Sequence, residues 1–91
     1  MIPPADWATP FVAQGWTWCD DMGGAYPSIA RIDRRGDFYS VMSDGSGSVL
    51  SAAATSPLYF TSLEGIVNAC DILADRNGGW AIGSPVQGGR G

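Results

Sequence analysis

The sequence predicts an α+β fold: a three- to four-stranded antiparallel sheet with one amphipathic helix packed on one face. Short segments rich in β-forming residues alternate with turns over residues 11–60, and a helical repeat follows. The chain has 91 residues, enough for one core only. We therefore expect an N-terminal arm over residues 1–10, a single α+β domain over residues 11–82 and a Gly-rich flexible tail over residues 83–91.

The first expected strand covers residues 11–19. This segment is rich in β-formers, and it places Trp16 and Trp18 on one face because side chains two apart along a strand point the same way. Residues 20–24 contain two aspartates and two glycines, the composition of a turn. The chain is therefore expected to reverse direction here.

Further short strands are expected at residues 28–33, 38–43 and 49–54. The first two are joined by a four-residue hairpin loop, Arg-Arg-Gly-Asp at 34–37, and a turn at 44–48 leads to the third. Pro57 then closes the run. The Arg-Gly-Asp tripeptide is also the integrin-recognition sequence, but a hairpin loop needs a glycine and polar flanks simply to reverse the chain.

A helix is predicted over residues 61–77. Thr61 and Glu64 match a capping box, in which each side chain satisfies a backbone N–H at the start of the helix. One helical face carries the apolar residues Leu63, Ile66, Val67, Cys70, Leu73 and Ala74. The glycines at 78 and 79 end the helix, and residues 80–82 are expected to add a short edge strand.

The composition argues against catalysis. The chain has five arginines but no lysine and no histidine. It therefore lacks the commonest general base and any lysine nucleophile. Aspartate pairs at 20–21 and at 33 and 37 could serve a hydrolase or a magnesium enzyme, but Asp is equally common as a cap in turns. We expect no enzyme activity, no cofactor and no catalytic residue.

Residues 44–47 resemble the centre of an EF-hand calcium loop. In that alignment Met42 and Ala53 occupy the two chelating ends, where Asp and a bidentate Glu are needed. A metal site is therefore not expected.

The charge favours a protein partner. A net charge of −4 argues against direct binding of DNA or RNA, which is built from clustered Lys and Arg. The predicted helix has a second face of polar residues, Glu64, Asn68, Asp71 and Asp75. An acidic stripe of this kind can occupy a basic groove of another protein. The alternatives are an ordinary solvated helix face, and a net charge that serves solubility alone.

Aromatic and basic residues add to the candidate contacts. Four tryptophans are more than one small core needs, so Trp16 and Trp18 are candidate partner contacts, with packing beneath the helix as the alternative. Arg34 and Arg35 concentrate basic charge on the hairpin loop and are candidates as well.

The cellular setting is inferred from the sequence ends and the cysteines. The first residues lack a secretory signal, and no stretch approaches a membrane span, so we expect a cytoplasmic protein that makes no membrane contact. Cys19 and Cys70 are then expected to be core thiols, with a disulfide or a reactive cysteine as the alternatives.

The layout resembles certain small acidic phage proteins, among them anti-CRISPR inhibitors. The residues that carry the resemblance are Gly15-Trp16-Thr17-Trp18, the acidic Gly-Gly turn, the short strands and the single helix, over residues 11–77. It implies a small, non-enzymatic protein in the host-cell cytoplasm that blocks the nucleic-acid channel or recruitment surface of a CRISPR effector.

Two functions follow as expectations. The first is a protein-binding inhibitor or regulator whose partner is a larger basic protein or a nucleic-acid-binding complex. The alternative is a small structural or assembly protein, of phage or bacterial origin, that self-associates, as in a homodimer, through an edge strand and its aromatic residues.

Overall fold

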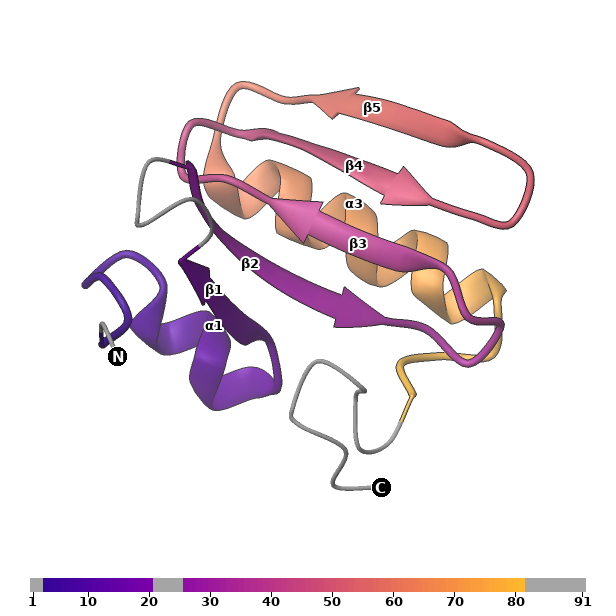
Figure 1. Cartoon of the computed structure of the whole chain (residues 1–91), viewed down its shortest axis with the longest axis horizontal. Helices are drawn as coiled ribbons and strands as arrows, with labels where there is room; N and C mark the ends of the chain where they lie inside the picture. Colours follow the sequence, from indigo (N-terminus) through magenta and orange to yellow (C-terminus); the bar gives the residue numbers. More distant parts are fainter. Residues whose placement is uncertain (1–2, 21–25, 82–91) are drawn as a thin grey trace.

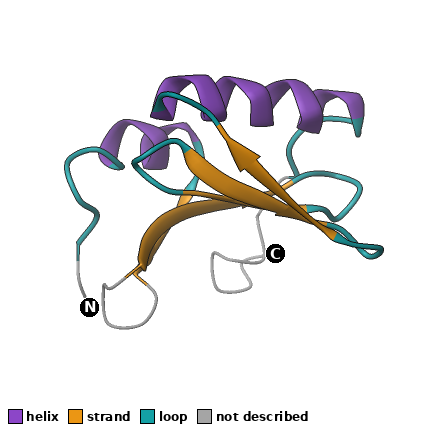
Figure 2. Cartoon of the chain, turned by 90° about the horizontal axis from the view of Figure 1, so that it is seen from above, coloured by secondary structure: helices purple, strands orange, loops and turns teal. Residues whose placement is uncertain are grey.

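The computed structural model describes residues 3–20 and 26–81, in which a five-stranded antiparallel sheet is joined to two helices (Figure 1). The strands are β1 (Thr17–Asp20), β2 (Tyr26–Ile32), β3 (Phe38–Val41), β4 (Ser46–Leu50) and β5 (Thr55–Tyr59); the helices are α1 (Thr9–Gln14) and α3 (Leu63–Arg76). Each strand pairs with its neighbour in sequence. Both helices lie on the same face of the sheet (Figure 2). The α+β class is confirmed, with one strand and one helix more than expected.

The extra helix, α1, replaces the first half of the strand expected at residues 11–19. Pro10 stands in the first turn, where its fixed φ suits a helix and its missing N–H costs nothing. Gly15 ends the helix with a φ of 119°, and the Trp16 N–H donates to the Phe11 oxygen at 3.0 Å. Only the second half of the expected strand remains, as β1.

Packing explains why residues 9–14 are helical. The side chains of Phe11 and Val12 pack against the core, as does Trp7 before the helix. Ala8 is fully buried. The packed region therefore reaches back into the range expected to be an N-terminal arm.

The hairpin between β2 and β3 forms as predicted. Ile32 pairs with Phe38, and Gly36 takes a φ of 102° in the loop between them. The next turn is also in the expected place: the Asp44 carboxylate accepts from the N–H and the hydroxyl of Ser46 at 2.9 and 2.6 Å. β4 starts at the end of this turn, three residues before the strand expected at 49–54.

The strand β5 was not predicted, because Pro57 lies in its middle and was expected to end the run. The Phe60 N–H donates to the Gly45 oxygen at 2.8 Å, and the Ser51 N–H donates to the Ala54 oxygen at 3.0 Å. Peptide groups alternate in direction along a strand, so these two bonds fix the nitrogen of Pro57 on the outer side of β5. A proline is tolerated there because an outer edge needs no donor.

The helix α3 is close to its prediction. Its N-cap is Ser62, whose hydroxyl accepts from the Gly65 N–H at 3.1 Å, one residue later than the expected Thr61 cap. The buried residues of the helix are Ile66, Val67, Cys70 and Ala74, all members of the predicted apolar face. At the other end the Gly79 N–H donates to the Ala74 oxygen at 2.8 Å, which closes the helix as the two glycines predicted.

The core lies between the helices and the sheet. Its buried members are Ala8, Trp16, Ile29, Tyr39, Val41, Ile66, Val67, Cys70 and Ala74. Cys70 is therefore a core thiol, as expected. Cys19 was expected in the core too, but it is half-buried and lies outside the core cluster, because its strand position turns it to the opposite face of the sheet from Trp18 and Ile29. The two cysteines therefore do not bridge each other.

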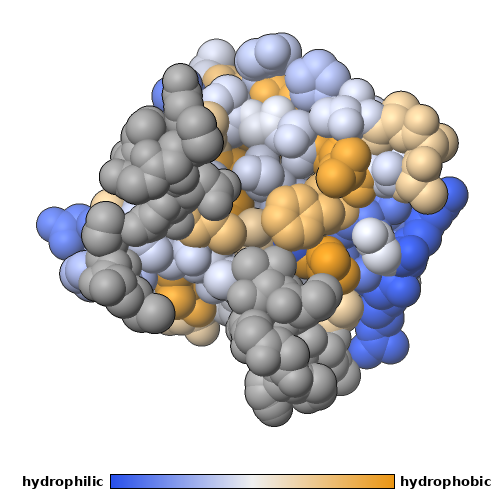
Figure 3. All heavy atoms as spheres, in the orientation of Figure 1, coloured by the Kyte–Doolittle hydropathy of each residue, from blue (hydrophilic) through white to orange (hydrophobic). Residues whose placement is uncertain are grey.

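No described helix covers the other face of the sheet. Figure 3 views the molecule from this face. A row of apolar residues crosses it where Ile32 pairs with Phe38 and Phe38 pairs with Leu50. Leu50 is 50% exposed. The surface there is apolar, next to the hydrophilic hairpin loop (Figure 3).

The chain after α3 returns to the sheet. Trp80 forms a single antiparallel bridge with Asp33, and the Ala81 N–H donates to the Ile32 oxygen at 2.9 Å, where a short edge strand was expected. The expected tail at 83–91 and most of the turn at 20–24 lie outside the described residues. Within residues 3–20 and 26–81, no helix has the length and apolar character needed to cross a membrane.

Candidate protein-binding site on helix α3

The predicted acidic stripe lies on the outer face of α3. Glu64, Asn68, Asp71 and Asp75 are all exposed, while the apolar face of the same helix packs on the sheet. The side-chain carboxylates of Glu64 and Asp75 make no hydrogen bond or ion pair within the described part of the chain. These carboxylates are therefore open to a partner.

Trp80 lies at the end of this stripe and is held from four sides. Its indole Nε1 donates to the Asp71 carboxylate at 3.0 Å. Its ring meets the rings of Trp16 and Tyr39 edge to face, with centroids 5.2 and 4.9 Å apart, and the Arg31 guanidinium lies 4.8 Å from its centroid. The orientation of Trp80 is thus fixed before any partner arrives.

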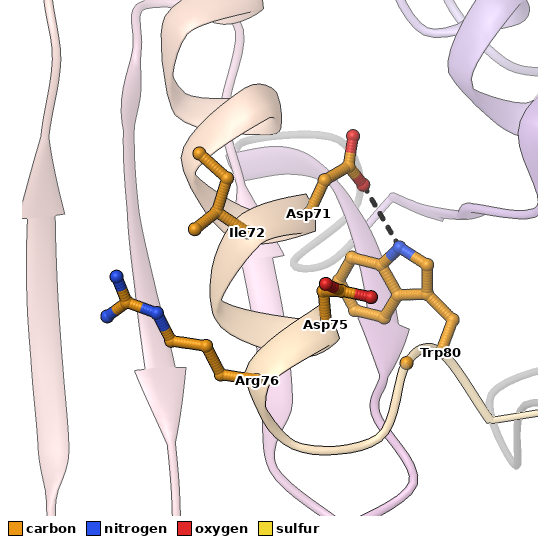
Figure 4. Close-up of a pocket in the computed structure, with 6 residues that line it drawn as sticks. Asp71, Ile72, Asp75, Arg76 and Trp80 are labelled. Carbon is orange, nitrogen blue, oxygen red and sulfur yellow. Dashed lines mark hydrogen bonds between the residues drawn. The ribbon is translucent and has the colours of Figure 1, made fainter.

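An open groove of about 510 Å³ runs over the last turns of α3 beside Trp80 (Figure 4). Asp71 and Asp75 lie one turn apart on the side of the helix that faces Trp80, and Ile72 and Arg76 extend on the other side. Ile72 is 49% exposed. The groove therefore offers two carboxylates close to apolar surface, which suits a long side chain with a cationic head.

Arg31 partly balances this acidic site. It is half-buried; burial lowers the pKa of its guanidinium, and the Asp71 carboxylate opposes that shift. Arginine stays protonated at neutral pH all the same. Asp71 thus faces one fixed cation, whereas Asp75 remains the carboxylate with free capacity for a partner.

The basic hairpin is brought to the same end of the molecule. The Arg34 N–H donates to the Gly79 oxygen at 2.9 Å, and the Arg34 Nε donates to the Trp80 oxygen at 3.5 Å. Arg34 and Arg35 are both exposed. Arg34 and Trp80, 46 residues apart in sequence, therefore meet next to the acidic stripe, whereas Arg35 lines a hollow with Asp37 and residues 51–53.

The two predicted tryptophans differ in their surroundings. Trp16 is 1% exposed and belongs to the core, so its ring is not accessible to a partner. The alternative given for Trp16, packing in the core, is therefore the correct one. Trp18 is half-buried, and its ring meets that of Trp7 with centroids 5.7 Å apart. The indole nitrogens of Trp16 and Trp18 are buried and have no hydrogen-bond partner among the described residues.

A buried carboxylate organises the Arg-Arg-Gly-Asp loop. Asp33 is 1% exposed and accepts from the N–H groups of Gly36 and Asp37, both at 3.0 Å, from the Tyr39 hydroxyl at 2.7 Å and from the Asn77 amide at 2.8 Å. Burial raises the pKa of Asp33, but these bonds together lower it more, so the group is ionised. Asp33 therefore has the capping role that Asp often takes in turns.

Of the remaining acidic candidates, Asp37 has a defined place, whereas Asp21 of the pair at 20–21 lies outside the described residues. The Asp37 carboxylate accepts from the Asn77 amide at 3.3 Å and is half-buried, so Asp37 is directed to helix α3 while Arg35 is exposed. Among the residues that the structure describes, no group of three or more His, Cys, Asp or Glu could hold a metal ion.

The sequence did not single out Trp80 as part of a site. It was counted with the other tryptophans, and a Trp directly after a Gly-Gly helix stop was the available signal. The sequence could not reveal that the chain turns back at this stop and lays the indole against α3. Comparisons with protein-family models, curated proteins and solved structures found no match to this chain.

Proposed function

We propose that this protein is a non-enzymatic binding module that docks a basic segment of a larger protein on the acidic stripe of α3 and in the groove beside Trp80. The observation that carries the proposal is the placement of Asp71 and Asp75 next to a fixed indole. A cationic head fits between the two carboxylates, and its aliphatic stem fits against the exposed part of Trp80.

The stripe is long enough to act on an extended surface. From Glu64 to Asp75 the helix spans about 16 Å, at about 1.5 Å per residue. A negative row of this length draws a positively charged groove by long-range attraction and competes with the polyanion that the groove normally holds. In its most concrete form, the protein is a phage anti-CRISPR inhibitor that blocks a nucleic-acid-binding effector in the host-cell cytoplasm.

Charge reversal at one position tests the proposal. Asp75→Arg removes a carboxylate that makes no hydrogen bond or ion pair with the described residues, and Asp6→Arg makes the same change of charge at another exposed residue, before α1. Both proteins are titrated against a panel of purified CRISPR effector complexes by calorimetry, with DNA binding by the effector as the second readout.

We expect an effector that binds the wild type with micromolar or better affinity, a loss of at least tenfold with Asp75→Arg and no change with Asp6→Arg. The loss should shrink as salt is raised, because screening weakens the attraction. If the two variants bind equally well, α3 is not the docking surface. If no complex on the panel binds, the effector-inhibitor form of the proposal fails.

Self-association is a second candidate, and the apolar row across the helix-free sheet face favours it. Leu50 and Tyr59 are 50% and 79% exposed there. Pairing through the β5 edge is less favourable, because Pro57 offers no donor on that side. Light scattering over a range of concentrations tests this candidate: a dimer that Leu50→Asp dissociates supports it, and a monomer at all concentrations contradicts it.

A further inference from the structure

A second groove, of about 340 Å³, opens between α3 and the edge of the sheet at β4 and β5. Its apolar walls are Val49, Leu58 and Leu73, which pack against the core and are only half-buried. Ser56 pairs with Val49 and also lines the groove. This position carries a short, exposed side chain where a large apolar one would close the gap between helix and sheet.

The far end of the groove is polar. Asp37, Asn77 and Arg76 line it, and the buried Asp33 lies directly behind them, bonded to Asn77 at 2.8 Å. The Asn77 amide also reaches the Asp37 carboxylate at 3.3 Å. This end therefore contains two carboxylates that are bridged by one neutral amide.

The two carboxylates at this end accept hydrogen bonds from neutral groups. Every hydrogen-bond partner of Asp33 is neutral: two backbone N–H groups, a tyrosine hydroxyl and an amide. Arg76 lines the groove, and the exposed Arg35 lines a neighbouring hollow that includes Asp37 and residues 51–53. Among the described residues, neither arginine forms an ion pair with Asp33 or Asp37.

Size narrows the class of ligand. Sites for small molecules and cofactors range over about 300–1,000 Å³, so this groove is at the small end of the range, which suits one long side chain. Apolar walls that lead to a carboxylate without an ion pair to the described residues complement an aliphatic stem with a cationic head. A guanidinium fits a carboxylate better than an ammonium does, because its planar fork can donate two parallel bonds.

We infer that this groove binds one arginine side chain of the partner protein, with its stem against Leu58 and Leu73 and its guanidinium on the Asp37 carboxylate. The inference deepens the proposed function and rests on it, since the partner is the same basic protein. The arginine site lies on the sheet side of α3, whereas the acidic stripe lies on the outer side. The partner then contacts α3 on both its outer side and its sheet side, near Arg76.

The test uses N-acetylarginine amide as the probe and N-acetylcitrulline amide, its neutral isostere, as the control. Each is titrated into the labelled protein, and amide shifts are followed by NMR. We expect saturable shifts at Leu58, Leu73 and Asn77 with the arginine probe, at millimolar affinity, and at least tenfold weaker binding of the citrulline probe. Equal binding of the two probes would overturn the inference.

Two variants complete the test. Asp37→Asn keeps the shape of the side chain and an acceptor for Asn77, but it removes the charge; we expect at least fivefold weaker arginine binding. Ser56→Trp fills the groove from the exposed edge strand and leaves the Asp33 network intact, so it serves if Asp37→Asn does not fold. Undiminished binding in the variant that folds contradicts the proposed site.

The outcomes separate this inference from the proposed function. If the arginine probe does not bind, while Asp75→Arg still weakens partner binding, only the groove is wrong. If the arginine probe binds and Asp37→Asn weakens its binding, while Asp75→Arg leaves partner binding unchanged, the arginine site is supported and the docking surface on α3 is contradicted.

Discussion

Replacing the buried carboxylate of Asp33 by an amide should strongly destabilise the fold. The carboxylate accepts four hydrogen bonds, and Asp33→Asn replaces one of its two oxygens by an NH₂ group. The Oδ2 atom accepts from the Tyr39 hydroxyl at 2.7 Å and from the Asn77 amide at 2.8 Å. In the variant, the Tyr39 hydroxyl and the Asn77 amide face the NH₂ group of Asn instead of an acceptor oxygen.

The magnitude follows from the bonds lost. A hydrogen bond to a charged group contributes about 1.5–3 kcal/mol to stability, so two of them give about 3–6 kcal/mol. The neutral amide is less costly to bury than the carboxylate, which favours the lower end, about 3 kcal/mol. For a domain of this size, that loss lowers Tm by about 12–24 °C, at about 4–8 °C per kcal/mol.

Urea and thermal unfolding, followed by circular dichroism, measure this loss. Tyr39→Phe is the matched control, because it removes only one of the two bonds to Oδ2 and should cost about half as much. The double variant should lose less than the sum of the two, because the Tyr39 hydroxyl has no acceptor to lose in the Asp33→Asn protein. A loss of under about 1 kcal/mol for Asp33→Asn would refute the reasoning.

The same variant has a signature in pH. The pKa of Asp33 is lower in the folded protein than its usual value near 4, because the hydrogen bonds outweigh burial. Its carboxylate therefore contributes stability above about pH 4, and this contribution is lost as the pH falls through the folded-state pKa. Wild type should lose more stability than Asp33→Asn between about pH 4 and pH 2.

Three further predictions concern other parts of the molecule. Trp80→Phe keeps a ring in place but loses the bond to Asp71, and urea unfolding should show a loss of about 1 kcal/mol, against about 3 kcal/mol or more for Trp80→Ala. Gly47→Ala would place a methyl group against the backbone oxygen of Ser40, so the pairing of β3 with β4 must shift. We expect Tm to fall by at least about 5 °C, and an unchanged Tm would show that the sheet can accommodate the methyl group. Burial raises the pKa of the Cys70 thiol to about 12, so iodoacetamide should modify Cys70 at neutral pH only in urea, as followed by mass spectrometry; rapid modification of the native protein would contradict its place in the core.

The parts of the fold that the sequence predicted well are those set by local chemistry. The spacing of apolar residues gave α3 and its buried face, and the glycines at 78 and 79 gave its end. The loop at 34–37 was found because Gly36 must adopt a positive φ between two β-rich segments. In each case neighbouring residues along the chain were sufficient to determine the structure.

The sequence failed where tertiary position overrides local preference. Pro57 predicts the end of a strand unless the residue is known to lie on an outer edge, and that position depends on the whole sheet. Phe11 and Val12 are good β-formers that become helical because they pack on a core built from distant residues. In the candidate site, the acidic stripe was predictable from helical spacing, but the return of Trp80 to α3 was not.

The pairing of each strand with its neighbour in sequence has a consequence for folding. Such contacts close short loops, so the sheet can form quickly and in order as the chain is synthesised. Trp80 is different, because it pairs with Asp33 and its ring meets those of Trp16 and Tyr39, which are far away in sequence. These contacts can form only once residue 80 has been synthesised, so a ribosome that stalls before residue 80 would hold a chain in which the Trp16 and Tyr39 rings lack this partner.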